Sequence, residues 1–219
     1  IRCWEASREA DATFPTVHRN LALAYYNKQH NSLEAKVSLE KAFELDPTDA
    51  RVLMELDQLY KKMGVLPYER LAFLERYPDL VNDRDDLYLE RATLYNLTGQ
   101  EVKALDSLLT HRFHPWEGGE GKVTGQYVFA HLELGKKAIR QKAFQQAVEH
   151  LAHCFDYPDN LGEGKLIGAQ ENDVYYWLGC AYEGLGDKTQ AHSCWEKAAV
   201  GSTTLHAAMY YNDQQPDKL

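Results

Sequence analysis

Residues 175–198 read YYWLGCAYEGLGDKTQAHSCWEKA, and this stretch decides the fold. Small and large residues recur in it at helical spacing on both sides of a turn at Gly186: Tyr175, Leu178, Gly179, Tyr182, Ala191, Trp195 and Ala198. Two antiparallel helices approach closely only where small side chains lie at their contact. The stretch therefore predicts such a helix pair, with Gly179, Ala191 and Ala198 at the contact and the large side chains filling the remaining space.

The same pattern recurs along the chain, and internal repetition is the strongest indication of an elongated array. Residues 15–48 fit if the turn at 28–32 carries an extra residue, and residues 85–113 and 126–158 fit as they stand. Residues 50–80 fit poorly, because Pro67 occupies the start of the second helix and Glu69 stands where Ala is expected. With residues 172–200, five helix pairs are predicted.

The spacing in residues 175–198 resembles the tetratricopeptide repeat (TPR) pattern, W-x2-L-G-x2-Y followed by A-x3-F. This resemblance implies an all-α fold: a right-handed α-solenoid of antiparallel helix pairs, in which each unit buries its apolar stripe against the next. We expect one repeat domain over residues 1–219, interrupted by two long glycine-rich loops between repeats.

The two ends of the sequence indicate further repeats. Cys3-Trp4-Glu5 matches Cys194-Trp195-Glu196, so residues 1–14 are interpreted as the end of an upstream repeat and residues 203–219 as the start of another. Arrays normally close with an atypical polar repeat, and the sequence has none. We therefore expect the chain to be a piece of a longer protein.

Composition limits the classes of partner. The formal net charge is −9 and no Lys/Arg cluster is present, so the field of the protein would repel a nucleic acid backbone. No apolar run approaches the ~18 residues that a membrane span needs. The four cysteines form no CxxC pair, which is typical of small buried side chains in a reducing, cytoplasmic setting. We expect no nucleic acid, membrane, metal or cofactor.

Two predicted loops carry the same short string. HPWEGGEGK occupies residues 114–122 and NLGEGK residues 160–165, so Gly-Glu-Gly-Lys, then an aliphatic residue, any residue and Gly, occurs at Gly119–Gly125 and again at Gly162–Gly168. Each copy follows the second helix of one repeat and precedes the first helix of the next. Because neighbouring helices pack about 8–10 Å apart, we expect Glu120 and Glu163 to lie within reach of one ligand.

Two interpretations of these loops remain open. In one they are connectors, in which each Glu caps a neighbouring helix N-terminus and each Lys is solvated. In the other they form a polar ligand site from His114, Trp116, Glu117, Glu120, Asn160 and Glu163. The glycines beside each Glu let the backbone turn tightly or approach a ligand closely, which suits both interpretations.

Two specific kinds of site, a phosphate-binding P-loop and a metal site, do not fit the loops. A phosphate-binding P-loop needs Ser or Thr after Gly-Lys and a preceding strand, but Val123 follows Lys122 and the preceding segment reads as helix. A metal site would use the three-residue spacing of His111, His114, Glu117 and Glu120. That spacing requires a helix, which Pro115 and the glycines at 118 and 119 break.

Glycoside hydrolysis is the third chemistry considered for the loops. It uses two carboxyl groups, and a Trp commonly supports the sugar ring, so Glu120, Glu163 and Trp116 supply the residue types. Loops of a solenoid rarely provide the rigid, dry pocket that this catalysis needs. We therefore assign no catalytic residue and interpret this chain as non-catalytic.

The TPR resemblance also implies a concave face, lined by the first helix of each repeat, that binds a protein or peptide. The residues predicted to contact a partner are Arg19, Tyr26, Arg51, Glu55, Gln58, Asp86 and Tyr176. They do not form the cluster of Lys and Arg that would hold a terminal carboxylate.

HPWEGGEGK, NLGEGK and YYNDQQPDK together resemble the C-terminal repeat region of a family of large bacterial proteins with a domain of unknown function. Those proteins carry a β-rich region, associated with carbohydrate, ahead of the repeats. The resemblance implies a scaffold for protein–protein or interdomain contacts. The alternative function is an accessory part of a carbohydrate-active enzyme, with carbohydrate contacting the two loops.

Overall fold

The computed structural model describes residues 1–200, in which the regular elements are twelve α-helices and one short 3-10 helix. The expected start of a further repeat at residues 203–219 lies outside this range. The chain divides into two compact units, residues 1–98 and the residues from 99 onward. The predicted all-α class is confirmed, and helices in each unit pack in pairs.

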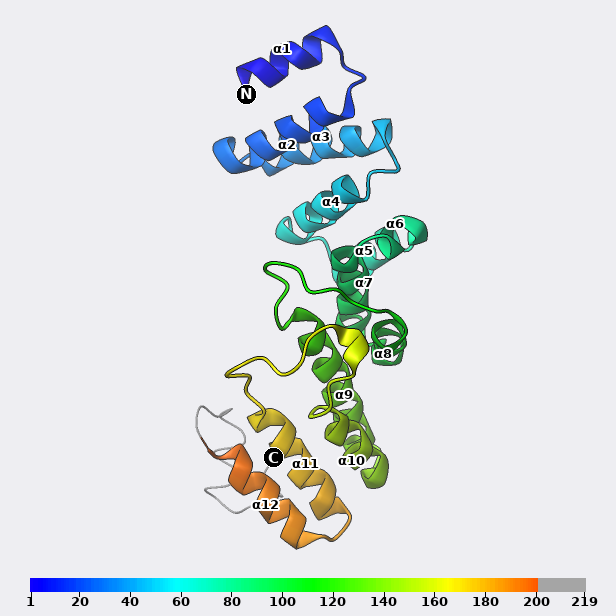
Figure 1. The fold of residues 1–219 in the computed structure, drawn as a ribbon, viewed down its shortest axis with the longest axis vertical. Coiled ribbons are helices and arrows are strands. Elements are labelled where there is room, and N and C mark those ends of the chain that lie inside the picture. Colours follow the sequence, from blue (N-terminus) through cyan, green and yellow to red (C-terminus); the bar gives the residue numbers. More distant parts are fainter. Residues whose placement is uncertain (201–219) are drawn as a thin grey trace. The chain divides into compact units, whose positions relative to one another are not determined.

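The first unit contains α1 (Arg2–Ala10), α2 (Pro15–Gln29), α3 (Ser32–Leu45), α4 (Ala50–Lys62), α5 (Pro67–Leu74), α6 (Pro78–Asn82) and α7 (Asp85–Leu97). Helices α2 and α3 form the most extensive pair and lie side by side in Figure 1. Helix α1 packs on α2, α4 on α3, and both α5 and α6 on α7. Together α2 and α3 span residues 15–45.

Local capping explains where several of these helices begin. The Asn31 side chain accepts a hydrogen bond from the Glu34 N–H at 3.1 Å, and Asp49 accepts from the Arg51 and Val52 N–H groups at 2.9 and 3.1 Å. These three bonds satisfy N–H groups that have no partner inside the first turn of a helix. Pro67, by contrast, is the first residue of α5, where its missing N–H costs nothing.

A hydrogen-bond pattern that recurs at equal intervals joins successive helix pairs of the first unit. The Tyr60 hydroxyl donates to Glu40 at 2.7 Å and the Tyr95 hydroxyl donates to Glu75 at 2.9 Å. Tyr25 and Glu5 form the same contact at 3.4 Å. In each case a Tyr on one helix reaches a Glu twenty residues earlier, on the last helix of the preceding pair or its C-terminal end. This contact explains why Tyr recurs at that repeat position.

The poorly fitting repeat of residues 50–80 is held by a buried ion network. The Arg70 guanidinium on α5 donates to Asp57 on α4 at 3.1 and 2.6 Å, and to Glu90 on α7 at 2.6 Å. Asp57 is 0% exposed and Arg70 only 2%. Helix α5 is therefore positioned by charge and hydrogen bonds in addition to its buried Leu71 and Leu74.

The second unit contains α8 (Glu101–Thr110), α9 (Lys122–Arg140), α10 (Phe144–His153), the 3-10 helix η1 (Asp159–Leu161), α11 (Asn172–Gly184) and α12 (Lys188–Ala198). Helix α9 pairs with α10 and α11 with α12, while α8 packs on α9 and α10 on α11 (Figure 1). These two pairs span residues 122–153 and 172–198.

The α11–α12 contact differs in detail from the prediction. A Cβ atom at Gly179 would lie 2.2 Å from Trp195 Nε1, so the indole of Trp195 lies directly against the glycine backbone. Gly135 on α9 receives Leu151 of α10 in the same way, with a Cβ only 2.6 Å from Leu151 Cγ. The glycines thus accommodate a large side chain from the paired helix, where small residues were expected to face small residues.

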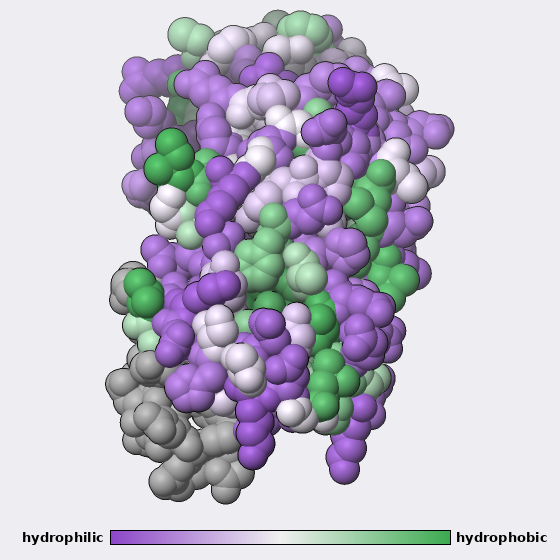
Figure 2. Space-filling view, turned by 60° about the horizontal axis from the view of Figure 1, so that its bottom comes forward, coloured by the Kyte–Doolittle hydropathy of each residue, from purple (hydrophilic) through white to green (hydrophobic). Residues whose placement is uncertain are grey.

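The surface of residues 1–200 mixes polar and apolar side chains. On the face drawn in Figure 2, hydrophobic residues form several patches separated by hydrophilic ones. Within the described residues, no helix combines the length and apolar character needed to cross a bilayer.

Candidate functional sites

The first candidate site is a groove within residues 1–98, formed by α2, α3 and α4. Its volume is about 310 Å³. The lining residues are Ala22, Leu23, Tyr26, Asn27, Ala35, Leu39, Met54, Glu55, Gln58, Leu59 and Lys62. Because α2 and α4 both contact α3, the side chains of α3 close the bottom of the space between them.

The two ends of the groove carry charge, whereas its middle is apolar. Near one end the Arg19 side chain on α2 donates two hydrogen bonds to the Glu55 carboxylate, and Arg51 Nε lies 3.3 Å from the same group. These hydrogen bonds raise the pKa of Arg19. Near the other end Lys62 Nζ lies 4.9 Å from the centre of the Tyr26 ring, a cation–π distance.

The groove gathers part of the predicted partner-binding set. Tyr26, Glu55 and Gln58 line it, while Arg19 and Arg51 hold the Glu55 carboxylate. Sequence reasoning missed the apolar lining, including Leu23, Met54 and Leu59. Helical spacing was the available signal, because positions three, four and seven after a predicted contact residue share its face of the helix.

Two predicted contact residues have other environments. Asp86 forms an ion pair of 2.6 Å with Arg84 at the start of α7. The prediction for Tyr176 is wrong: its side chain is 2% exposed and packs with Ala191, Trp195 and Ala198 in the α11–α12 core. Two consecutive tyrosines precede Trp177, and the helix turns the second of them inward.

The second candidate site lies in the second unit, where the segment after α8 meets the segment after α10. The Phe113 N–H donates to the Asn160 carbonyl at 2.8 Å. The Asn160 amide donates in turn to the Leu108 and His111 carbonyls, both at 2.8 Å. Asn160 therefore satisfies carbonyls at the C-terminus of α8. It does not line the neighbouring pocket, where a ligand contact was predicted.

Glu163 caps the N-terminus of α9 from across the loop. Its Oε2 accepts from the Gly121 N–H at 2.8 Å, and its Oε1 accepts from the Val123 and Thr124 N–H groups, both at 3.1 Å. The Thr124 hydroxyl adds a fourth donor at 3.2 Å. A carboxylate is favourable here because the N-terminal end of a helix carries partial positive charge.

This cap explains why α9 begins at Lys122, ahead of the predicted start at residue 126. It also makes the two Gly-Glu-Gly-Lys strings structurally different. Gly125 lies inside α9, whereas its counterpart Gly168 has φ +82° in the connecting segment. Lys165 is exposed, as the connector interpretation expects, and it pairs with Glu171 at 2.7 Å.

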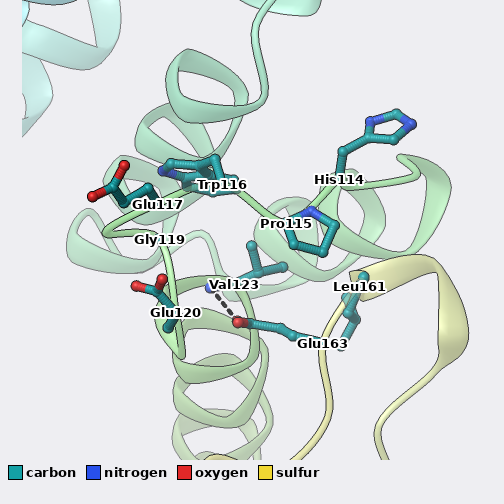
Figure 3. Close-up of a pocket in the computed structure, with 10 residues that line it drawn as sticks. His114, Pro115, Trp116, Glu117, Gly119, Glu120, Val123, Leu161 and Glu163 are labelled. Atoms are coloured by element: carbon teal, nitrogen blue, oxygen red, sulfur yellow. Dashed lines mark hydrogen bonds between the residues drawn. The ribbon is translucent and has the colours of Figure 1, made fainter.

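A pocket of about 270 Å³ opens where the two segments meet (Figure 3). It is lined by His114, Pro115, Trp116, Glu117, Gly119, Glu120, Val123, Leu161, Gly162 and Glu163. We call this space the loop pocket. Five of the six predicted ligand residues line it, with Asn160 the exception. Pro115, Val123 and Leu161 were missed, and composition gave no signal for them.

The backbone of the loop pocket is closely packed. A Cβ at Gly119 would lie 2.3 Å from Trp116 Cε2, so the indole rests on this glycine. Gly162 has φ +74°, and a Cβ there would lie 2.5 Å from the Phe113 carbonyl oxygen. A side chain at position 162 would push the two segments apart, whereas a side chain at position 119 would displace the Trp116 indole.

The chemistry of the loop pocket is acidic and aromatic. Glu117 and Glu120 are exposed, and the Glu163 carboxylate already accepts four hydrogen bonds from α9. A pair of free carboxyls at Glu120 and Glu163, as glycoside hydrolysis needs, does not match this arrangement. Among residues 1–200, no three His, Cys, Asp or Glu side chains are grouped so as to hold a metal ion.

The comparisons with known proteins agree with the helical pairing. Residues 173–199 match the tetratricopeptide repeat family model. A crystal structure of YrrB, described as a TPR protein with an unusual peptide-binding site, has a TM-score of 0.60 at 15% identity and covers 96% of this chain and 97% of that one. A crystal structure of the MamA protein has a TM-score of 0.55 at 17% identity, covering 91% of this chain and 94% of that one. Residues 173–199 thus match the tetratricopeptide repeat pattern, and the all-helical fold of the chain is similar to that of a solved TPR protein.

Proposed function

We propose that this chain is a non-catalytic scaffold that binds a segment of a protein partner in the groove of α2, α3 and α4. The observation that carries the proposal is the groove itself, which is apolar in its middle and charged at both ends. The partner is another protein or another protein domain. The similarity to YrrB supports the class of function, because YrrB is a TPR protein with a peptide-binding site.

The lining of the groove favours a particular kind of partner segment. Leu23, Met54 and Leu59 offer apolar contact, and Met adapts to differently shaped side chains. The amides of Asn27 and Gln58 belong to opposite walls and provide both donors and acceptors for a peptide backbone. The Glu55 carboxylate is already matched by Arg19 and Arg51. The best fit is therefore an extended segment with apolar side chains.

A site-specific photo-crosslinker tests the groove. Peptides that bind the 219-residue protein would first be selected from a displayed random library. A crosslinking amino acid would then replace Leu23, which lines the groove and is 36% exposed. The matched control places it at Leu33 on α3, which is 70% exposed and does not line the groove. We expect the selected peptides to carry several apolar side chains. They should crosslink to the amino acid at position 23 and not to the one at position 33.

Equal crosslinking at both positions would refute the proposed groove, as would selected peptides that still bind after Leu23→Asp and Met54→Asp. Both substitutions introduce a charge into the apolar middle of the groove, so they should weaken a genuine complex by at least about tenfold.

The alternative function is a saccharide contact within a carbohydrate-active enzyme. One observation favours it, which is that Trp116, Glu120 and Glu163 line one pocket. The capping role of Glu163 removes one of the two carboxylates from that scheme. For this reason the scaffold function has the stronger support.

A further inference from the structure

We propose that the loop pocket binds an organic cation, namely a guanidinium or alkylammonium group. The inference is independent of the groove in residues 1–98, since every residue of the loop pocket belongs to the second unit. It rests on the charge of the lining, on the Trp116 ring, and on the way the two segments are fixed.

The charge of the lining has one sign. Glu117, Glu120 and Glu163 contribute carboxylates, and neither Lys nor Arg is among the residues that line the pocket. Glu163 is compensated by the N–H groups at the start of α9. The charges of Glu117 and Glu120 are not compensated by any residue of the lining, and Figure 3 places both carboxylates on the same side of the pocket.

The aromatic ring supplies the second element of cation recognition. Trp116 is partly exposed, its indole rests on Gly119, and it lines the same pocket as the two carboxylates. The face of an indole carries partial negative charge and is the best cation–π partner among the aromatic side chains. A planar guanidinium or a compact ammonium group placed on this face would also lie near Glu117 or Glu120.

The third element is pre-organisation. Four hydrogen bonds to Glu163 and the Phe113–Asn160 backbone bond fix the two segments against each other without a ligand. A binding site that is already ordered does not lose loop freedom when it binds. At about 270 Å³ the pocket suits the end of one side chain or a small amine, and it is smaller than typical sites for larger organic ligands.

Two sources could present such a cation: an Arg or Lys side chain of a protein partner, or a free polyamine. Nuclear magnetic resonance of the full chain, observing the indole N–H of Trp116, would separate them. The cationic probes are N-acetyl-arginine methylamide, N-acetyl-lysine methylamide and spermidine. N-acetyl-citrulline methylamide, which has nearly the shape of the arginine compound but no charge, is the control. A neutral trisaccharide tests whether the pocket binds a carbohydrate in place of a cation.

We expect a saturable shift of the Trp116 indole signal with the cationic probes, and binding at least about tenfold weaker for the citrulline compound. Tighter binding of the blocked amino acids than of spermidine would assign the site to a partner side chain, and the reverse order to a free amine. Glu117→Gln with Glu120→Gln should weaken binding about tenfold. The matched control, Glu149→Gln, removes an exposed carboxylate on α10 and should leave binding unchanged.

Trp116→Leu gives a second, charge-neutral variant that lacks the indole signal, so its binding is followed by the backbone amide signals of Gly119 and Glu120. We expect about fivefold weaker binding, and the helical circular dichroism signal would verify its fold. The proposal is overturned if the citrulline compound binds as tightly as the arginine compound, if the trisaccharide shifts Trp116 and the cations do not, or if no cationic probe produces a saturable shift.

Discussion

At the scale of single residues, Arg70 is a buried cation at the centre of an ion network in the first unit. It joins α4, α5 and α7 through Asp57 and Glu90. Burial opposes ionisation of Glu90, but its bonds to Arg70 and Lys61 outweigh burial and lower its pKa. Arg70→Met would leave the Asp57 carboxylate, which is 0% exposed, without its partner. We expect the free energy of unfolding to fall by about 3–5 kcal/mol in urea denaturation.

The double variant Asp57→Leu with Arg70→Met distinguishes a lost ion pair from lost packing. Apolar side chains at positions 57 and 70 remove the uncompensated buried charge of Asp57, while Glu90 keeps its ion pair with Lys61. We therefore expect the double variant to recover most of the lost free energy. A single Arg70→Met variant that loses less than about 1 kcal/mol would show that Asp57 does not depend on Arg70.

At the scale of elements, the α9–α10 contact contains three histidines and should respond to pH. His131 Nδ1 lies 3.2 Å from His150 Nδ1, and the His153 ring centre lies 5.0 Å from that of His131. Burial, with added repulsion from His153 and His150, lowers the pKa of His131 to about 4. The unfolded value is about 6.5, so protons bind the unfolded chain first. Stability is therefore complete above pH ~6.5 and is lost as the pH falls towards 4.

The full effect is about 3 kcal/mol, and it would be measured as the midpoint of urea unfolding across this pH range. His131→Phe removes the titrating group and keeps a ring against Tyr127, whose own ring lies 4.7 Å away. We expect the variant to lose clearly less stability than the parent between pH 6.5 and 4. Parallel pH profiles for the two proteins would contradict the assignment to His131.

The same scale shows how far sequence can predict structure. The positions of Gly179 and Trp195 indicated the α11–α12 pair. These residues contact each other and are close in sequence, so a short repeated pattern is enough to reveal them. The two Gly-Glu-Gly-Lys strings could not be predicted in the same way. Glu163 reaches donors about forty residues earlier in the chain, whereas Glu120 stays exposed, so tertiary contacts give similar strings different conformations.

At the scale of the whole molecule, each candidate site belongs to one unit. The groove uses helices that pack on α3, and its contact residues were partly predictable because they share helix faces. The loop pocket depends on Asn160, Gly162 and Glu163 bridging two connecting segments, which no local pattern specifies. The fold could thus be inferred from repeated spacing, while the second site required the three-dimensional contacts.

The separate contact sets lead to a prediction about the whole chain. In helical repeat proteins stability is approximately a sum of local and nearest-neighbour contributions, so a lost contact should affect mainly its own surroundings. All partners of Arg70 lie in residues 1–98, and all partners of the Glu163 carboxylate lie in the second unit. Hydrogen exchange followed by mass spectrometry should therefore show faster exchange in α4, α5 and α7 for Arg70→Met.

For Glu163→Gln, which weakens a helix cap, we expect about fivefold faster exchange confined to the start of α9, which corresponds to a loss of about 1 kcal/mol in local stability. Each variant is the control for the other, and a uniform increase along the chain in either one would mean that the two units unfold as a single cooperative body.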